Sequence, residues 1–556
     1  MRSRLVLALA VLIIPCLTAR CDEVFDIPAA VRGAPAEFVR GLIVADEESA
    51  KLPADRWPDL SVKGLRDQAA RDRAAFDKLH AVARNELTGE DRTLYDLFEW
   101  RLNRRLEQFH LRLYLTPFWD DDRYVTFAGV LGTANALSDA SRGKVESFPA
   151  YTNQAIALLR EGMRVRMLPS KELVQPFSSR CSSTPSGGNS GDPAWSKAQQ
   201  AAKGFCDFLS NEYLPACPVS RNLTHWPNGK EVYRELARRY TTTDLDPKQI
   251  HKFGIKEVAR IRAAMLPVIA RTGYKGSLNE FLKYARTDPR FYFTRGDDLL
   301  AAYRAALERI TPLVPTVIGY IPHRSLRVEP YEGEGAAIWH GPRPEQPEPT
   351  VYVAVNKPEI HPKFEIIPLM LHEGTPGHEL QHAVADELHA SKTDVISTFE
   401  QNAGDNAAFA EGWALYAEGL GREMSLYSDP YEEFGELRME LTRAVRVVID
   451  TGIHSNGWTE SRAKKYFVTE TGKPEADVDS EVSRTLWPGG QLAYKVGQFR
   501  IRHLREEASR ALGTQFDVRP FHDAILRWGP LPLDILERKL NECLNAPSCA
   551  AELRQH

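Results

Sequence analysis

The chain has 556 residues, of which 43% are hydrophobic and 26% charged, and its formal net charge is −4. This composition is ordinary for a globular enzyme, and the length favours two lobes or one large domain. The small negative charge provides no basic footprint for a polyanion, so a nucleic-acid partner is excluded from the expected functions.

The first residues predict a signal peptide over 1–21. Two early arginines precede an apolar run at 5–17, which is short for a membrane span but typical of a signal sequence. Cleavage is expected near Ala19 or Cys21, and Arg20 disfavours lipid attachment at that cysteine. An uncleaved signal anchor is the alternative. No later segment reaches eighteen uninterrupted apolar residues, so we expect an exported protein, periplasmic or secreted, with no stable membrane span in the mature chain.

The segment 22–312 is predicted to form a helical N-terminal region. Apolar side chains recur every three or four positions over 29–171 and 194–312, for example at Leu94, Phe98, Leu102 and Leu106. A Ser/Gly/Pro-rich block near 178–193 predicts an exposed loop. Residues 243–248 predict a break followed by a helix N-cap.

The segment 313–556 is predicted to be the catalytic, metal-binding region. Prolines are frequent over 312–362, and 350–356 is the clearest strand because it is rich in β-branched and aromatic residues. Helical patterning returns from 366 onward. The predicted fold class is therefore mainly α, with one small β-sheet directly before the candidate active-site helix.

Cysteine usage agrees with export. Cys543 and Cys549 flank a short loop near the C-terminus and are the best disulfide candidates. A second bridge is expected among Cys181, Cys206 and Cys217. No CxxC pair is present, so a zinc site built from thiolates is not expected.

One string has the spacing of a zinc-hydrolase motif. His378-Glu379-Leu-Gln-His382 places two imidazoles at i and i+4 on one helix face, with a glutamate beside them. Thr375 and Pro376 are suited to the N-cap and first position of that helix.

A second His-Glu pair, His372-Glu373, lies six residues before His378. On an uninterrupted helix six residues correspond to a rotation of about 240°, so the two histidines would diverge. A bulge or break at Pro376-Gly377 would bring them together. Two geometries therefore compete: a regular helix using His378, Glu379 and His382, and a broken one using His372, Glu373 and His378.

A third ligand is expected from another helix. The segment 409–419 has an amphipathic pattern with Glu411 and Glu418 seven residues apart, hence on one face. Glu411 is the candidate ligand, and Glu418 lies either behind the metal or in solvent.

Four strings together resemble the bacterial family called domain of unknown function 885 (DUF885). They occur in matching order between 362 and 498: His372-Glu-Gly-Thr-Pro-Gly-His378-x-Leu-Gln381, Glu411-Gly-Trp-Ala-Leu-Tyr-Ala-Glu418, Asp450-Thr-Gly-Ile-His454-Ser-Asn-Gly-Trp-Thr459 and Leu492-Ala-Tyr494-Lys-Val-Gly497. The family is grouped with glutamate-ligand (gluzincin-like) zinc metallopeptidases, near the long-helix folds of oligopeptidases and carboxypeptidases.

The resemblance implies one zinc ion held by His372, His378 and Glu411, with Glu373 as general base. Two positions depart from the family pattern: Glu379 stands where a second histidine is frequent, and Gly490 where glutamine is usual. These departures keep His382 and Glu379 as rivals of His372 and Glu373.

Other candidates come from the same strings. Tyr494 and His454 are candidate donors to an oxyanion, and each could instead be a packed core residue or a helix cap. Arg443, Arg446 and Arg484 could bind a substrate carboxylate or form structural ion pairs.

The predicted function is zinc-dependent hydrolysis of short peptides, with Glu373 activating water. The alternatives are hydrolysis of a non-peptide amide or ester, and a non-catalytic binding protein that retains the fold.

Overall fold

The computed structural model describes residues 34–51, 55–118, 141–181, 191–333, 335–389, 395–403 and 407–553. The predicted signal peptide at 1–21 lies outside these residues. Within them the protein is mainly helical and contains one three-stranded sheet, in agreement with the predicted fold class.

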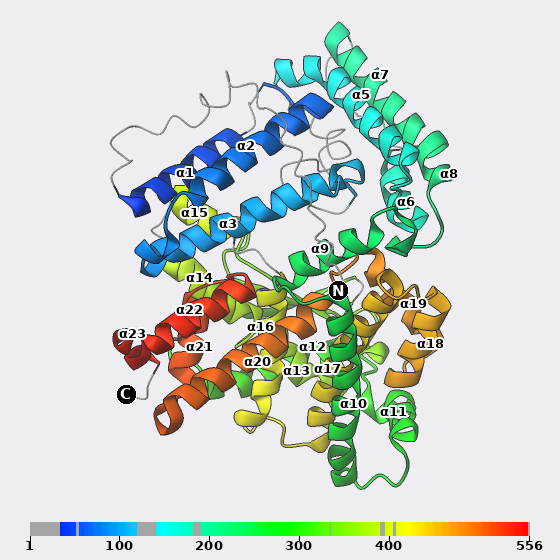
Figure 1. The fold of residues 1–556 in the computed structure, drawn as a ribbon. Coiled ribbons are helices and arrows are strands. Elements are labelled where there is room, and N and C mark those ends of the chain that lie inside the picture. The colour runs from blue at the N-terminus through cyan, green and yellow to red at the C-terminus, as the bar shows by residue number, and fades with distance from the viewer. Residues whose placement is uncertain are drawn as a thin grey trace, which may run out of the picture.

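The N-terminal helices form two groups, which lie together at the top of Figure 1. Helices α1, α2 and α3 contact one another, and α5 packs along α7. The predicted apolar stripe is confirmed on α3 at Leu94, Phe98 and Leu102, which are buried, whereas Leu106 at its end is half-buried. The helices are α1 (Pro35–Ala50), α2 (Val62–His80), α3 (Gly89–His110), α5 (Arg142–Arg164), α6 (Lys171–Arg180), α7 (Pro193–Phe208), α8 (Leu214–Ala216) and α9 (Gly229–Thr241).

The predicted break at 243–248 is confirmed by a capping box. The Asp246 side chain accepts a hydrogen bond from the backbone of the first turn of α10, and the Gln249 side chain accepts one from the Asp246 backbone nitrogen. The following helices are α10 (Pro247–Arg271), α11 (Leu278–Thr287) and α12 (Gly296–Ile310).

The sheet contains the predicted strand at its centre. Strand β3 (Thr350–Ala354) pairs in parallel with β1 (Arg327–Tyr331) and antiparallel with β2 (Ala337–His340). The order β1-β3-β2 makes β2 an edge strand, and β2 contacts helix α13 (Ile366–Glu373). The sheet is therefore attached to the helix that carries the candidate site.

The C-terminal half is built from long helices. Two tightly packed pairs dominate it, α10 on α17 and α16 on α20. The helices after α13 are α14 (His378–His389), α15 (Val395–Ala403), α16 (Ala407–Glu423), α17 (Pro430–His454), α18 (Glu460–Thr471), α19 (Glu475–Ser483), α20 (Leu492–Leu512), α21 (Val518–Arg527), α22 (Leu533–Asn545) and α23 (Pro547–Glu552).

One large hydrophobic cluster joins the start of the chain to its C-terminal half. It combines buried residues of α1 and α3, such as Val39 and Phe98, with residues of the site-bearing helices, such as Met370 and Trp413. A separate cluster fills the space among α5, α7 and α9. The first cluster contains residues from both sides of residue 312. The division of the chain near that residue stays a prediction.

Both predicted disulfide regions contain a bridge. Cys543 is bonded to Cys549, and Cys181 to Cys206, while Cys217 is buried as a free thiol. The predicted loop near 178–193 is wrong at its start: Ser178 lies in α6, where its hydroxyl hydrogen-bonds Ser210 at 2.8 Å. Burial of this helix end therefore outweighs the loop-like composition, and residues 182–190 lie outside the described residues.

Among the described helices, none combines the length and the apolar character needed to cross a membrane.

Candidate metal centre

The histidine-rich segment is two helices joined by a sharp break. Helix α13 ends at Glu373 and α14 begins at His378, so the chain turns within four residues. Gly377 makes the turn possible: a Cβ atom there would lie 2.0 Å from the carbonyl oxygen of His372. The prediction that Thr375 and Pro376 start the helix is therefore wrong, because both residues lie in the break.

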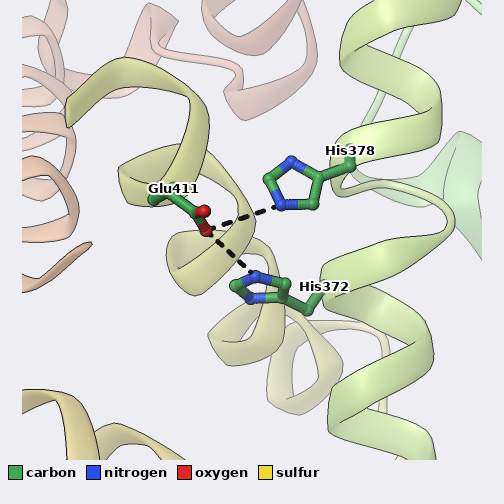
Figure 2. A group of neighbouring side chains, drawn as sticks. All are labelled: His372, His378 and Glu411. Carbon is green, nitrogen blue, oxygen red and sulfur yellow. Dashed lines mark ion pairs between the residues drawn. The ribbon is translucent and has the colours of Figure 1, made fainter. Parts of the chain in front are cut away.

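The break brings the two histidines together. Their ring centroids are 4.9 Å apart and the rings are nearly perpendicular. The Nε2 atoms of His372 and His378 lie 3.3 Å and 3.5 Å from the same oxygen of Glu411, Oε2. Figure 2 shows the three side chains pointing toward one another from α13, α14 and α16. The structure thus groups the three predicted ligands.

This arrangement fits a zinc ion. Two imidazole nitrogens and a carboxylate are a ligand set typical of catalytic zinc, and they leave a fourth position for water or substrate. Ligands at about 2.0–2.2 Å from a tetrahedral ion lie about 3.4 Å apart, close to the two observed separations of 3.3 and 3.5 Å. The three donor atoms all lie within 4.8 Å of one another.

A close helix crossing positions Glu411. The next residue, Gly412, packs against Gly497 of α20, and a Cβ on Gly412 would lie 2.5 Å from the Gly497 Cα. Trp413, one position further, donates from its indole nitrogen to the Pro376 carbonyl at 2.8 Å. Helix α16 is therefore fastened to α20 on one side and to the α13–α14 break on the other.

The same crossing brings Tyr494 to the site. Tyr494 lies in the first turn of α20, and its hydroxyl is close enough to Glu411 to interact with that carboxylate. Burial, and then the Glu411 carboxylate, raise the pKa of Tyr494, so its hydroxyl stays protonated and able to donate. The structure thus brings this predicted oxyanion donor to the predicted ligands.

Electrostatic interactions within the group are strong. Burial would raise the pKa of Glu411, but hydrogen bonds to His372 and His378 hold it well below its usual range. Burial likewise opposes the charged form of His372, but hydrogen bonds to Glu411 and Glu418 raise its pKa to about 9. In the metal-free protein these carboxylates therefore favour the protonated form of the His372 ring. A metal ion that binds this ring would have to displace a proton from it.

Glu418 lies behind His372. It is fully buried, and its Oε1 accepts a hydrogen bond from the His372 Nδ1 at 2.8 Å. Such a bond fixes the tautomer of a ligand histidine and leaves its Nε2 to face the metal. The sequence left two positions for Glu418, behind a metal ligand or in solvent. The structure places it behind His372.

Glu373 is held by the sheet. It follows His372 directly, and its Oε2 accepts a hydrogen bond from the Trp339 backbone nitrogen at 3.0 Å. Strand β2 thus fixes the predicted general base beside the ligand group. Sequence reasoning missed Trp339, because a four-residue strand carries little periodicity.

The rival residues of the regular-helix geometry have other partners. The buried Glu379 accepts hydrogen bonds from Arg324 and from the Trp339 indole, both at 2.7 Å. His382 is exposed, and its ring stacks on Trp339 with centroids 4.4 Å apart. The structure therefore groups His372, and not His382, with His378 and Glu411.

His454 lies elsewhere. It is fully buried at the end of α17, its Nε2 bonds the Thr485 carbonyl at 2.8 Å, and its ring stacks on Tyr233. Burial lowers the pKa of His454 to about 3. A neutral ring engaged in this way belongs to the packing of α17, so the structure does not bring this predicted oxyanion donor to the group.

The family described as "Bacterial protein of unknown function (DUF885)" matches residues 43–540. The chain belongs to the DUF885 family. The resemblance seen in the four sequence strings is thereby confirmed. No curated protein matches the sequence.

Two solved structures share the fold of this DUF885 protein. The "putative lipoprotein" from Colwellia psychrerythraea is 21% identical, with a TM-score of 0.67 over 94% of this chain and 98% of its own. A "putative lipoprotein of unknown function" from Shewanella oneidensis is 18% identical, with a TM-score of 0.71 over 92% of this chain and 100% of its own. At these identities the likeness concerns the fold alone.

Proposed function

We propose that this protein is an exported zinc-dependent peptidase of the gluzincin type, acting on short peptides. The observation that supports the proposal most directly is the convergence of His372, His378 and Glu411 through the helix break. A structural metal site would more often be closed by four protein ligands, whereas this group offers three.

Zinc bound there would polarise a scissile carbonyl and make water a better nucleophile at neutral pH. Glu373 would accept a proton from the attacking water and return it to the leaving amine, in an orientation set by the Trp339 backbone. The Tyr494 hydroxyl, protonated and next to Glu411, would donate to the developing oxyanion. Each role falls to a residue within or beside the ligand group.

Export is proposed on two grounds. The residues at 1–21 have the charged start and short apolar run of a signal peptide. Two proteins with the same fold bear the description of lipoprotein.

Metal content and peptide cleavage together test the function. The purified protein is expected to bind one equivalent of zinc and to cleave a mixed peptide library in a chelator-sensitive manner. Glu411→Gln should lose zinc, whereas Glu373→Gln should keep zinc and lose cleavage. These two variants separate metal binding from proton transfer.

Glu379→Gln is the matched comparison, because Glu379, like Glu373, directly follows a candidate ligand histidine. Cleavage that persists in Glu373→Gln and disappears in Glu379→Gln would favour the regular-helix geometry. Zinc binding without cleavage of any peptide would favour a non-peptide amide or ester, to be tested on such compounds. Absence of zinc would leave the binding-protein alternative.

A further inference from the structure

A group of basic side chains adjoins the candidate site on the side of Tyr494. Arg443 and Arg446 lie on α17, and both interact electrostatically with Tyr494. Arg443 also interacts with Glu411. Its Nη2 atom lies 3.6 Å from Oε1 of Glu418, the carboxylate that contacts the ligand His372, so Arg443 adjoins the ligand group.

Arg443 has few partners for a buried guanidinium. Its side chain is 13% exposed, and among the described residues it forms an ion pair with Glu418, at 3.6 Å between Nη2 and Oε1. That oxygen already accepts a hydrogen bond from His372. The Nε atom of Arg443 is buried without a hydrogen-bond partner among the described residues, and one Nη donates to the Met439 carbonyl at 3.3 Å. Arg443 thus retains unused donors.

The neighbouring cations share a single carboxylate. Glu481 binds Arg446 and Lys473, each at 2.7 Å, and lies 3.8 Å from Arg484. Together with Arg443 these residues are four cations, against the three carboxylates Glu481, Glu418 and Glu411. Burial, together with repulsion from Arg443 and Arg484, lowers the pKa of Arg446 despite the Glu481 carboxylate. The positive charge of the group is therefore not fully balanced.

The four cations differ in exposure, and Arg443 and Arg446 are the two most buried. The side chain of Arg446 is 10% exposed, that of Lys473 21% and that of Arg484 53%. The group extends in this way from the buried surroundings of Glu411 to the protein surface. Arg484 is therefore the member of the group that is most accessible to an anion in solvent.

We propose that Arg443, supported by Arg446 and Arg484, binds a carboxylate of the peptide substrate, either its C-terminus or an acidic side chain. The unused donors of Arg443 and the excess of positive charge beside Tyr494 carry this inference. A guanidinium binds a carboxylate through two parallel hydrogen bonds, which fixes both position and orientation. The inference rests on the proposed peptidase function and narrows its substrates.

Three forms of one N-acetylated peptide library test the inference on the zinc-loaded full-length protein. The forms carry a free C-terminal carboxylate, a neutral C-terminal amide, or a C-terminal amide with one acidic side chain. A charged hydrogen bond to the substrate should raise kcat/KM roughly 10- to 100-fold over the neutral form. Whichever carboxylate-bearing form shows the increase identifies the source of the carboxylate.

The variants locate the effect. In Arg443→Met the ratio of kcat/KM between the carboxylate and neutral forms should fall close to one. Arg484→Met removes a side chain that is 53% exposed and only 3.8 Å from its partner Glu481, and it should reduce the ratio severalfold. Lys464→Met is the matched control: Lys464 of α18 pairs with Asp479 of α19, the helix that ends at the C-cap residue Arg484, and its removal should leave the ratio unchanged.

Chelator-sensitive cleavage of all three library forms at equal rates would overturn the inference and leave the peptidase function intact. An unchanged ratio in both Arg443→Met and Arg484→Met would also overturn it. If no form is cleaved in a chelator-sensitive manner, the proposed function fails and this inference fails with it. Zinc content and circular dichroism of each variant show whether it has folded.

Discussion

Replacing Glu418 by glutamine tests whether the carboxylate behind His372 tunes the metal centre. Glu418 is fully buried, and its Oε1 accepts the His372 Nδ1 hydrogen bond at 2.8 Å. Glutamine has the same shape and can still accept this bond through its amide oxygen. Its amide nitrogen would replace Oε2, which has no hydrogen-bond partner in the described structure. The substitution therefore removes chiefly the negative charge.

Loss of that charge should weaken zinc binding. The carboxylate makes the imidazole a stronger ligand, and removal of such a partner costs about 10- to 100-fold in metal affinity. This corresponds to about 1.4–2.8 kcal/mol of binding free energy. The dissociation constant is measured by competition with a zinc chelator of known affinity, in the wild-type protein and in Glu418→Gln.

Glu423→Gln is the matched control, because Glu423 lies on the same helix and pairs with Arg505 away from the site. It should leave zinc affinity unchanged. Equal zinc affinity in Glu418→Gln and the wild-type protein, with His372→Ala losing zinc, would refute the role assigned to Glu418.

Three further predictions concern stability. Gly497→Ala would place a Cβ 2.0 Å from the Ala408 carbonyl oxygen, a backbone atom that cannot move aside, so it should lower the free energy of unfolding by about 3 kcal/mol in urea titrations. Gly204→Ala, at a helical site where a Cβ would have nothing within 4 Å, should instead raise it by about 0.4–1 kcal/mol. Equal effects of the two substitutions would contradict the close crossing of α16 and α20. The pKa of His454 falls from 6.5 to about 3 on folding, so the unfolded chain binds the extra proton, and the contribution of His454 to stability is complete above about pH 6.5 and is lost as pH falls toward 3. By pH 5 the loss is about 2 kcal/mol, and the difference in the free energy of unfolding between wild type and His454→Gln should change by that amount between pH 8 and 5. A constant difference would argue against a buried neutral ring. Zinc at 100 times its dissociation constant should raise the free energy of unfolding of the wild-type protein by about 2.7 kcal/mol, measured as an increase in melting temperature that a chelator abolishes. An equal effect of zinc in His378→Ala would argue against this site.

Most of the helical framework follows from local sequence. The stripe at Leu94, Phe98 and Leu102 predicts the buried face of α3, because apolar side chains four residues apart share one side of a helix. Asp246 followed by proline predicts the start of α10, since both residues favour the first turn. Strand β1 was not predicted, because it contains Pro330 and its pairing partner lies more than twenty residues away.

The candidate ligands could be named from the sequence, but the geometry that groups them could not be predicted. The sequence offered two sets of ligands, since Pro376-Gly377 permits a helix break without requiring one. The break is decided by the close contact of Gly377 with the end of α13, which is a property of the folded chain. The placement of Trp339 next to Glu373, and of His454 among core residues, likewise depends on contacts between segments distant in sequence.

The contact between Gly412 and Gly497 has a consequence for how a metal would be taken up. Where the backbones of α16 and α20 touch, no side chains lie between the helices that could adjust their spacing. The neighbouring Glu411 is therefore held in a fixed position. The ordering of the ligands is then complete once the chain has folded, and little reorganisation accompanies ion entry. Zinc-free and zinc-loaded forms should superpose closely, and the frame would favour ions whose size matches the fixed spacing of the donors over larger ones.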